Sequence, residues 1–180
     1  SSPPDITTVH FAAGLNLGDE CNVTLTSGSI SSDPTLGTNA ILLMRSVLSI
    51  VVLDKGDPVE GATLTIGGES FSSDTDGSAT YFTDAREITE SGNTWGGSLT
   101  VIMQSSGLMD MMMWDTNSSL SKTFLASTVE AGTQDDWVIL EAAWSPYYLA
   151  DDLTISETAT LTLHDNAQLV IANDVAITLE

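Results

Sequence analysis

Residues 153–179 read Leu153-Thr-Ile-Ser-Glu-Thr-Ala-Thr-Leu161-Thr-Leu-His-Asp-Asn-Ala-Gln-Leu169-Val-Ile-Ala-Asn-Asp-Val-Ala-Ile177-Thr-Leu179. Apolar residues recur every eight positions in this stretch, and a second apolar series follows two positions later. Apolar residues two positions apart are typical of short strands, and the polar residues between them suit turns. The stretch therefore predicts four short strands.

Two arrangements of these strands fit the eight-residue period. The stretch resembles the opening coils of right-handed parallel β-helices in surface proteins and adhesins, where three eight-residue sides would make a coil of about 24 residues. An antiparallel meander fits as well, because four-residue connections suit hairpins. The sequence leaves both arrangements open.

The rest of the chain also predicts an all-β protein, because short β-type runs alternate with clusters of Gly, Ser, Asn and Asp. The methionine-rich run 108–114 is expected to be a strand whose methionines fill the core, although thioethers could also bind a soft metal or an apolar partner. The other expected strands are 6–11, 21–26, 40–45, 48–53, 62–66, 79–82, 99–103, 123–127 and 137–140.

Residues 48–82 carry a second family resemblance. Pro58 fixes φ at a strand entry, Gly61 suits a bulge, and Asp76-Gly77 is a strong turn signal. This succession of a proline at a strand entry, a glycine step and an Asp-Gly turn resembles the carboxypeptidase-regulatory-like, transthyretin-like β-sandwich modules. Such modules serve as scaffolds and adaptors. The resemblance implies a sandwich without catalytic residues.

These observations predict an all-β fold in two parts. We expect residues 1–145 to form a β-sandwich that includes an N-terminal arm. The sandwich is expected to be immunoglobulin-like or transthyretin-like, with a jelly roll as a further option. Residues 146–180 form the strand-repeat segment, and whether it packs on the same core stays open.

The charge balance limits the partners. Only Lys55, Lys122, Arg45 and Arg86 oppose 25 carboxylates, which gives a net charge of −21. We expect no binding to nucleic acid, because phosphate binding needs clustered cations. We also expect no direct insertion into a membrane, because no apolar run of about 20 residues is present. Cations are the natural partners of such a surface, although the charge could equally serve solubility alone.

Calcium is the cofactor that would suit these carboxylates, because it takes six to eight oxygen ligands. Asp74-Thr-Asp76-Gly looks like half an EF-hand loop, but the position of the required glutamate is Ala85, so turn chemistry is the competing explanation. Carboxylates in predicted turns are the candidate metal ligands: Asp74, Asp76, Asp135, Asp136, Asp151 and Asp152.

The sequence predicts no enzyme. His10 and His164 are the only histidines, and neither lies beside a nucleophile motif such as Gly-x-Ser-x-Gly. A carbohydrate-binding or adhesin module, with surface glycans as partners, is the alternative function. In that case we expect Trp137 and Trp144 in the core and Tyr147-Tyr148 exposed to sugar rings.

Several features favour a secreted protein at the cell surface. The sequence begins Ser-Ser-Pro-Pro without Met, as expected after removal of a signal peptide. Cys21 is alone, so no intrachain disulfide is expected. Asn22 and Asn117 match the N-glycosylation pattern.

The C-terminal residues predict an open sheet edge, since Glu180 directly follows a predicted strand and open edges invite strand addition. We therefore expect an extracellular structural protein whose copies join head to tail in a filament, tube or surface layer, with calcium as a bridge. The expected assembly residues are Ile6, Val9 and Phe11 on a donor strand and Ile177 and Leu179 on the receiving edge.

Overall fold

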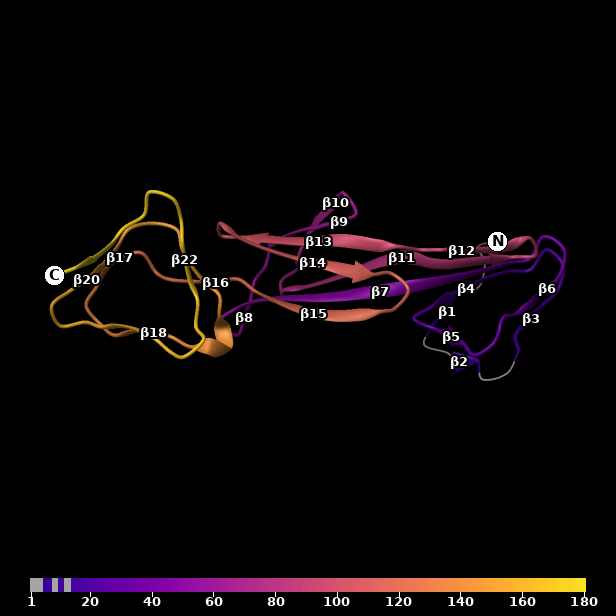
Figure 1. Ribbon diagram of the computed structural model, residues 1–180, viewed down its shortest axis with the longest axis horizontal. Helices are drawn as coiled ribbons and strands as arrows, with labels where there is room; N and C mark the ends of the chain where they lie inside the picture. Colours follow the sequence, from indigo (N-terminus) through magenta and orange to yellow (C-terminus); the bar gives the residue numbers. More distant parts are fainter. Residues whose placement is uncertain (1–4, 8–9, 12–13) are drawn as a thin grey trace. The chain divides into compact units, whose positions relative to one another are not determined.

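The computed structural model describes residues 5–7, 10–11 and 14–180, which fold almost entirely into β-strands (Figure 1). The one helical element in that part of the chain is a 3-10 turn at Ala142–Trp144. No helix among these residues is long and apolar enough to cross a membrane. The predicted all-β class is confirmed.

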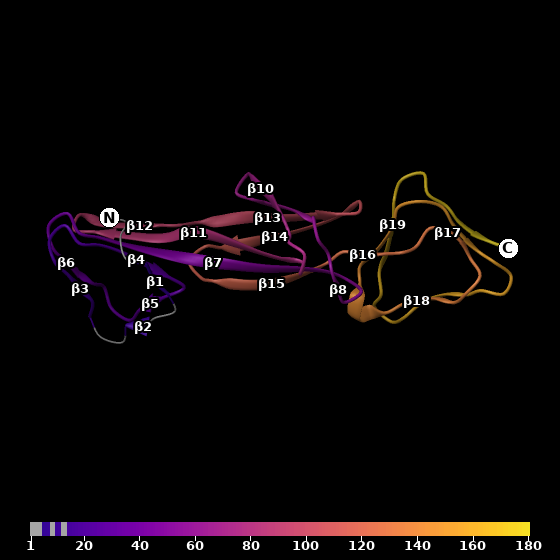
Figure 2. The ribbon, with the colours of Figure 1, turned by 180° about the vertical axis from the view of Figure 1, so that it is seen from behind.

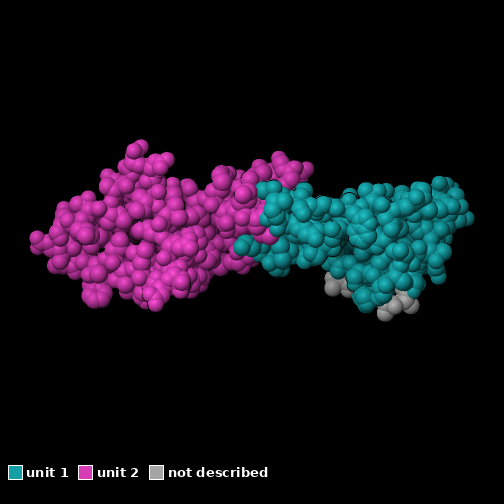
Figure 3. Space-filling model, in the orientation of Figure 1, with its two compact units in different colours: residues 1–49, 80–100, 113–122 teal, residues 50–79, 101–112, 123–180 magenta. Residues whose placement is uncertain are grey.

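The chain divides into two compact units, each with a buried core of its own (Figure 3). The division into these two units does not test the domain boundary expected at residue 145, which stays a prediction. The first unit holds residues 1–49, 80–100 and 113–122, and the second holds residues 50–79, 101–112 and 123–180.

Short strands at the start of the first unit pair in parallel, as successive turns of a three-sided coil (Figure 1). The register is constant, since Asn16 pairs with Thr35 and Asn22 with Ile41, 19 residues further on. The sides are β1 (Asp5–Thr7), β4 (Asn22–Thr26) and β7 (Ile41–Asp54); β2 (His10–Phe11) and β5 (Ser29–Ile30); and β3 (Asn16–Leu17) and β6 (Thr35–Leu36).

The corners of these coils repeat with the same spacing. Glu20 and Asn39 both take the left-handed conformation with a φ of 57°. Asp19 Oδ1 accepts a hydrogen bond at 2.8 Å from the backbone N–H of Thr38 in the next coil. The residues that form the core are Val23, Leu25, Leu42 and Ile88.

These parallel coils correct the expectation for the N-terminal part of the chain. A β-sandwich is built from antiparallel strands, whereas β1 to β6 pair only in parallel in the described residues. The predicted β-sandwich of residues 1–145 is therefore not borne out over this part, which is a β-solenoid.

The middle of the chain forms longer, mostly antiparallel strands. β7 also pairs with β8 (Asp57–Pro58), β11 (Ser78–Thr89) and β15 (Leu120–Leu125), and β12 (Gly92–Trp95) lies beside β11. A four-stranded sheet follows the order β10 (Glu69–Ser72), β9 (Thr63–Ile66), β13 (Ser98–Ser105) and β14 (Leu108–Asp115).

The turns expected between residues 58 and 78 are formed. Gly61 and Gly77 have positive φ values of 77° and 73°. The buried hydroxyl of Ser73 donates to the carbonyl of Val59 at 2.6 Å and accepts from the N–H of Ala62 at 3.0 Å. Because a buried backbone group without a partner is costly, this hydroxyl helps to fix the connection between these strands.

The C-terminal residues of the second unit form a second set of three-sided parallel coils (Figure 1, Figure 2). Every pairing here is parallel, so the coil and not the antiparallel meander is formed. The sides are β16 (Ser127–Thr128), β19 (Tyr147–Leu149) and β22 (Leu169–Ile171); β17 (Gly132–Gln134), β20 (Leu153–Ile155) and β23 (Ile177–Leu179); and β18 (Val138–Leu140) and β21 (Leu161–Leu163).

Polar corner residues connect each of these coils to the next. Asp152 Oδ1 accepts from the N–H of Ala176 at 2.8 Å, and Ser145 Oγ accepts from the N–H of Gln168 at 2.9 Å. These side chains satisfy backbone donors that no strand partner reaches. The buried residues of this core are Val129, Leu140, Tyr147, Leu149, Leu153 and Ile155.

Candidate functional site: the open coil of residues 161–179

The apolar side chains of the C-terminal coils stack in two columns on each side of the coil. In one column of each side the last residue, Leu161, Leu169 or Ile177, still packs against the core. In the other column a buried residue pairs in register with an exposed one. The pairs, with their exposed fractions, are Leu140 (1%) and Leu163 (45%), Leu149 (0%) and Ile171 (44%), and Ile155 (3%) and Leu179 (74%).

For Leu149 and Ile155 this contrast arises because coils lie on both sides of them, since β19 and β20 are central strands. Leu140 is buried although β18 pairs with β21 alone in the described residues. Within the described residues, β21, β22 and β23 each pair with a strand on one side only. We call these strands, residues 161–179, the open coil. Its unpaired strand edges and uncovered apolar residues are the features that invite a further strand.

A groove of about 480 Å³ lies at the open coil. Ile155, Leu161 and Leu179 give it an apolar lining, while Glu157 and Glu180 add two carboxylates. The groove can therefore receive apolar side chains, but its carboxylates repel an equally acidic partner at close range.

The structure places the predicted assembly residues differently. Ile177 and Leu179 both line the groove of the open coil, and their role as a receiving edge stays a prediction. Phe11, in contrast, packs against the core of the first unit, and the strand of Ile6 pairs with β4. Val9 lies outside the described residues.

Leu163 and Ile171 were missed as site residues, although a signal for them exists. Together with Leu179 they form the second apolar series of the eight-residue period. That series alone could not show that its members would be exposed, because exposure depends on which strands pair.

Asp74 and Asp76 lie together in one turn, the only predicted metal ligands that the structure brings into contact. Both carboxylates accept the backbone N–H of Ser78, at 2.9 and 3.0 Å. A hydrogen bond with Asp74, followed by those with Ser78, holds the pKa of Asp76 below its ordinary value. This arrangement is that of a turn, because the carboxylates are engaged with the backbone.

The other four candidates lie at opposite ends of one strand pair. Asp151 and Asp152 precede β20, whereas Asp135 and Asp136 follow its parallel partner β17. Among the residues that the structure describes, no group of three or more His, Cys, Asp or Glu side chains is arranged to hold a metal. Calcium binding stays a prediction.

The two histidines contact hydroxyl or carboxylate groups in separate places. His10 Nδ1 lies 2.6 Å from Ser29 Oγ, and His164 Nδ1 lies 2.9 Å from Glu141 Oε2. The predicted glycosylation residues Asn22 and Asn117 are both exposed, so the attachment of glycan to them stays a prediction.

The aromatic and methionine residues are placed differently from expectation. Trp137 is exposed and Tyr147 is buried, which reverses both expectations, while Trp144 packs against the core as expected. The core-filling interpretation is wrong for Met109 and Met111, which are exposed because alternate residues of β14 face outward.

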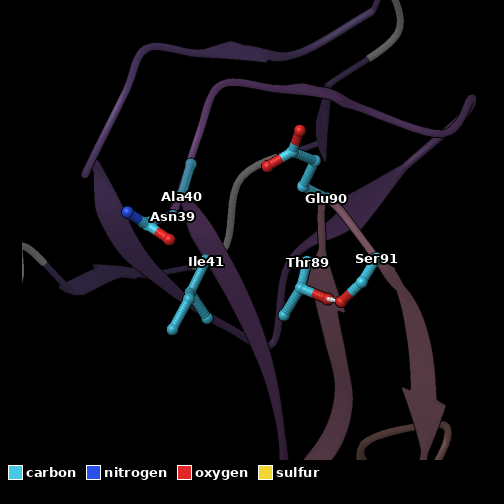
Figure 4. A pocket seen from close by; sticks show the side chains of 6 residues that line it. All are labelled: Asn39, Ala40, Ile41, Thr89, Glu90 and Ser91. Carbon is cyan, nitrogen blue, oxygen red and sulfur yellow. Dashed lines mark hydrogen bonds between the residues drawn. The ribbon is translucent and has the colours of Figure 1, made fainter.

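A cavity of about 480 Å³ in the first unit offers little chemistry. Two segments line it, Asn39–Ile41 and Thr89–Ser91 (Figure 4). Thr89 Oγ1 lies 3.1 Å from Ser91 Oγ, and Glu90 is the one carboxylate among the lining residues. A glycosidase needs two carboxyl groups across its substrate, and this lining has one.

Comparison with models of known protein families gives no match for this chain, and comparison with curated protein sequences gives none either. Its function is therefore inferred from the geometry of its own residues.

Proposed function

We propose that this protein is an extracellular structural subunit, not an enzyme, whose copies assemble through the open coil into a filament, tube or surface layer. The observation that carries the proposal is the set of exposed apolar residues Leu163, Ile171 and Leu179, one on each side of the open coil. Full burial of such a side chain contributes about 1.5–3 kcal/mol, so a coil stacked on this surface would gain from all three.

A second copy of this chain is the proposed occupant. The first coil of the N-terminal solenoid has three strands, β1, β2 and β3, and each pairs on one side only within the described residues. The open coil likewise presents a strand on each of its three sides. A contact between two unlike surfaces can repeat from copy to copy, and it generates a filament where the rotation between copies does not close a ring.

The acidic surface supports a control by cations. A net charge of −21 makes copies repel each other, and Glu157 and Glu180 lie at the proposed contact. Salt shortens the range of that repulsion to about 10 Å at 0.1 M, which lets apolar burial dominate at contact. We propose calcium as an additional bridge between carboxylates of two copies.

The segment 48–82 fits the role of a scaffold in this proposal. Gly61 and Gly77 have positive φ values, which supports the tight step and the turn expected there from the sequence. The alternative, a carbohydrate-binding or adhesin module at the cell surface, is favoured by one observation, the exposed indole of Trp137.

Sedimentation and negative-stain electron microscopy of the purified chain test the assembly, in about 0.15 M NaCl. We expect filaments or sheets for the wild type and monomers for Leu179→Asp, because the new carboxylate would be buried at the contact. Thr178→Asp adds the same charge on the outward face of the same strand and should still assemble. A wild-type protein that stays monomeric at every concentration would refute the proposal.

A further inference from the structure

A small cavity in the first unit contains two of the four cationic residues of the chain. Its volume is about 220 Å³, and Arg45, Arg86 and Trp95 line it together with Asn117 and the apolar Met44. No carboxylate is among its lining residues, although the chain has 25 Asp and Glu against 4 Lys and Arg. Each of the two arginines has one carboxylate partner outside this lining, Asp84 for Arg45 and Asp33 for Arg86.

Arg86 is held in place but is not fully satisfied. Its guanidinium lies 4.2 Å from the ring centroid of Trp95, the residue opposite it on β12, and its Nη2 donates to Asp33 Oδ1 at 2.8 Å. Its Nε is buried and has no hydrogen-bond partner in the described part of the chain. A buried donor without an acceptor costs about 1–3 kcal/mol or more when charged, so an acceptor placed beside this N–H would stabilise Arg86.

Arg45 supplies a second, more accessible guanidinium. Its Nε donates to Asp84 Oδ1 at 3.0 Å, and its side chain is partly exposed. The strand order of the sheet brings it to the same cavity as Arg86, because β7 and β11 are neighbouring strands. Two guanidinium groups around one space suit a carboxylate, which accepts hydrogen bonds from arginine in a planar geometry.

We propose that this cavity binds a small acidic sugar of the uronic acid class. The carboxylate is the acceptor for Arg86 and Arg45, and the sugar ring lies beside the Trp95 indole, one face of which the Arg86 guanidinium covers. The Asn117 amide, which also donates to Asp115 Oδ1, faces the hydroxyl groups. The volume suits one ring, since it is below the 300–1,000 Å³ of sites for drug-sized ligands. This site is independent of the open coil.

Titration calorimetry of the full chain with D-glucuronate tests the site, with D-glucose as the neutral match and inorganic sulfate as the anion without a ring, in about 0.15 M NaCl. We expect saturable binding of glucuronate, none of glucose, and binding of sulfate weaker by about tenfold or more. Equal binding of glucose or sulfate, or no binding of glucuronate, would overturn the proposal.

Arg45→Gln is the informative variant, because Arg86 is nearly buried and its replacement could prevent folding. It should weaken glucuronate binding by about tenfold or more, since a charge-assisted hydrogen bond is lost. Lys122→Gln removes one positive charge outside the cavity and should leave binding unchanged. Binding that survives Arg45→Gln at full strength would refute the assignment. Leu179→Asp should still bind, whether or not copies assemble.

Discussion

Ile155 and Leu179 are register partners on neighbouring parallel strands, yet Ile155 is 3% exposed and Leu179 is 74% exposed. The same column of side chains therefore passes from a closed core to an open surface in one step. The burial of Leu179 is what the proposed assembly would change.

Alanine at these two positions should have unequal effects on the monomer. Ile155→Ala should lower the free energy of unfolding by about 2–5 kcal/mol, because it leaves a cavity in a packed core. Leu179→Ala should cost less than about 1 kcal/mol, since little buried area is lost. Denaturant unfolding of dilute protein measures both. Equal losses would mean that Leu179 is already covered in solution.

Assembly should depend on ionic strength. We expect association to be weaker in about 0.01 M salt than in about 0.15 M salt, because the Debye length falls from about 30 Å to about 8 Å. Light scattering at fixed protein concentration measures the difference. At constant ionic strength, added calcium should promote association further if carboxylates are bridged, and a chelator should reverse only that increment. Association that is indifferent to both conditions would leave the acidity without a role in assembly.

Gly77 and Gly61 provide a matched pair for the turns of the second unit. Both have a positive φ, so alanine is strained at either by about 1–2 kcal/mol. A Cβ at Gly77 would also lie 2.5 Å from the carbonyl oxygen of Val52, whereas a Cβ at Gly61 would meet open space. Gly77→Ala should therefore destabilise the fold more than Gly61→Ala in thermal unfolding. Equal shifts in melting temperature would contradict the crowding around Gly77.

Asp76 should make the fold sensitive to acid. Its folded pKa is lowered, first by the hydrogen bond with Asp74, so the folded state favours the ionised form. The stabilisation is fully present above the ordinary pKa of about 3.9 and is lost as the pH falls through the folded value. Asp76→Asn should flatten the free energy of unfolding between about pH 5 and pH 2, while Glu69→Gln, an exposed carboxylate on β10, should not. The same pH dependence in both variants would exclude the Asp76 turn as its source.

The C-terminal coils were partly predictable. The eight-residue series that includes Leu163 and Leu179 predicts short strands at the right positions, because it follows the two-residue alternation of a strand. Parallel pairing could not be deduced, since it depends on partners about 20 residues away and both topologies suit the same local pattern.

The N-terminal coils had a weaker signal. Leu17-Gly18 recurs as Leu36-Gly37 after 19 residues, the period of the coil, but the strands there are only two residues long. Such short strands show no alternation.

Exposure was the property that local sequence predicted worst. Met109 and Tyr147 are both large side chains on strands, but one faces outward from β14 and the other inward in a coil. The cavity lined by Arg45 and Arg86 was equally hard to predict from local sequence, because the two residues meet only through the pairing of strands far apart in the chain.

The corners of the C-terminal solenoid vary in length while its columns stay aligned. From Ser127 to its partner Tyr147 the chain advances 20 positions, and from Leu153 to its partner Ile177 it advances 24. Extra residues are thus absorbed outside the core, as loops commonly allow. A protein built in this way can acquire insertions or tags at its corners, and so new surface properties, without redesign of its interior.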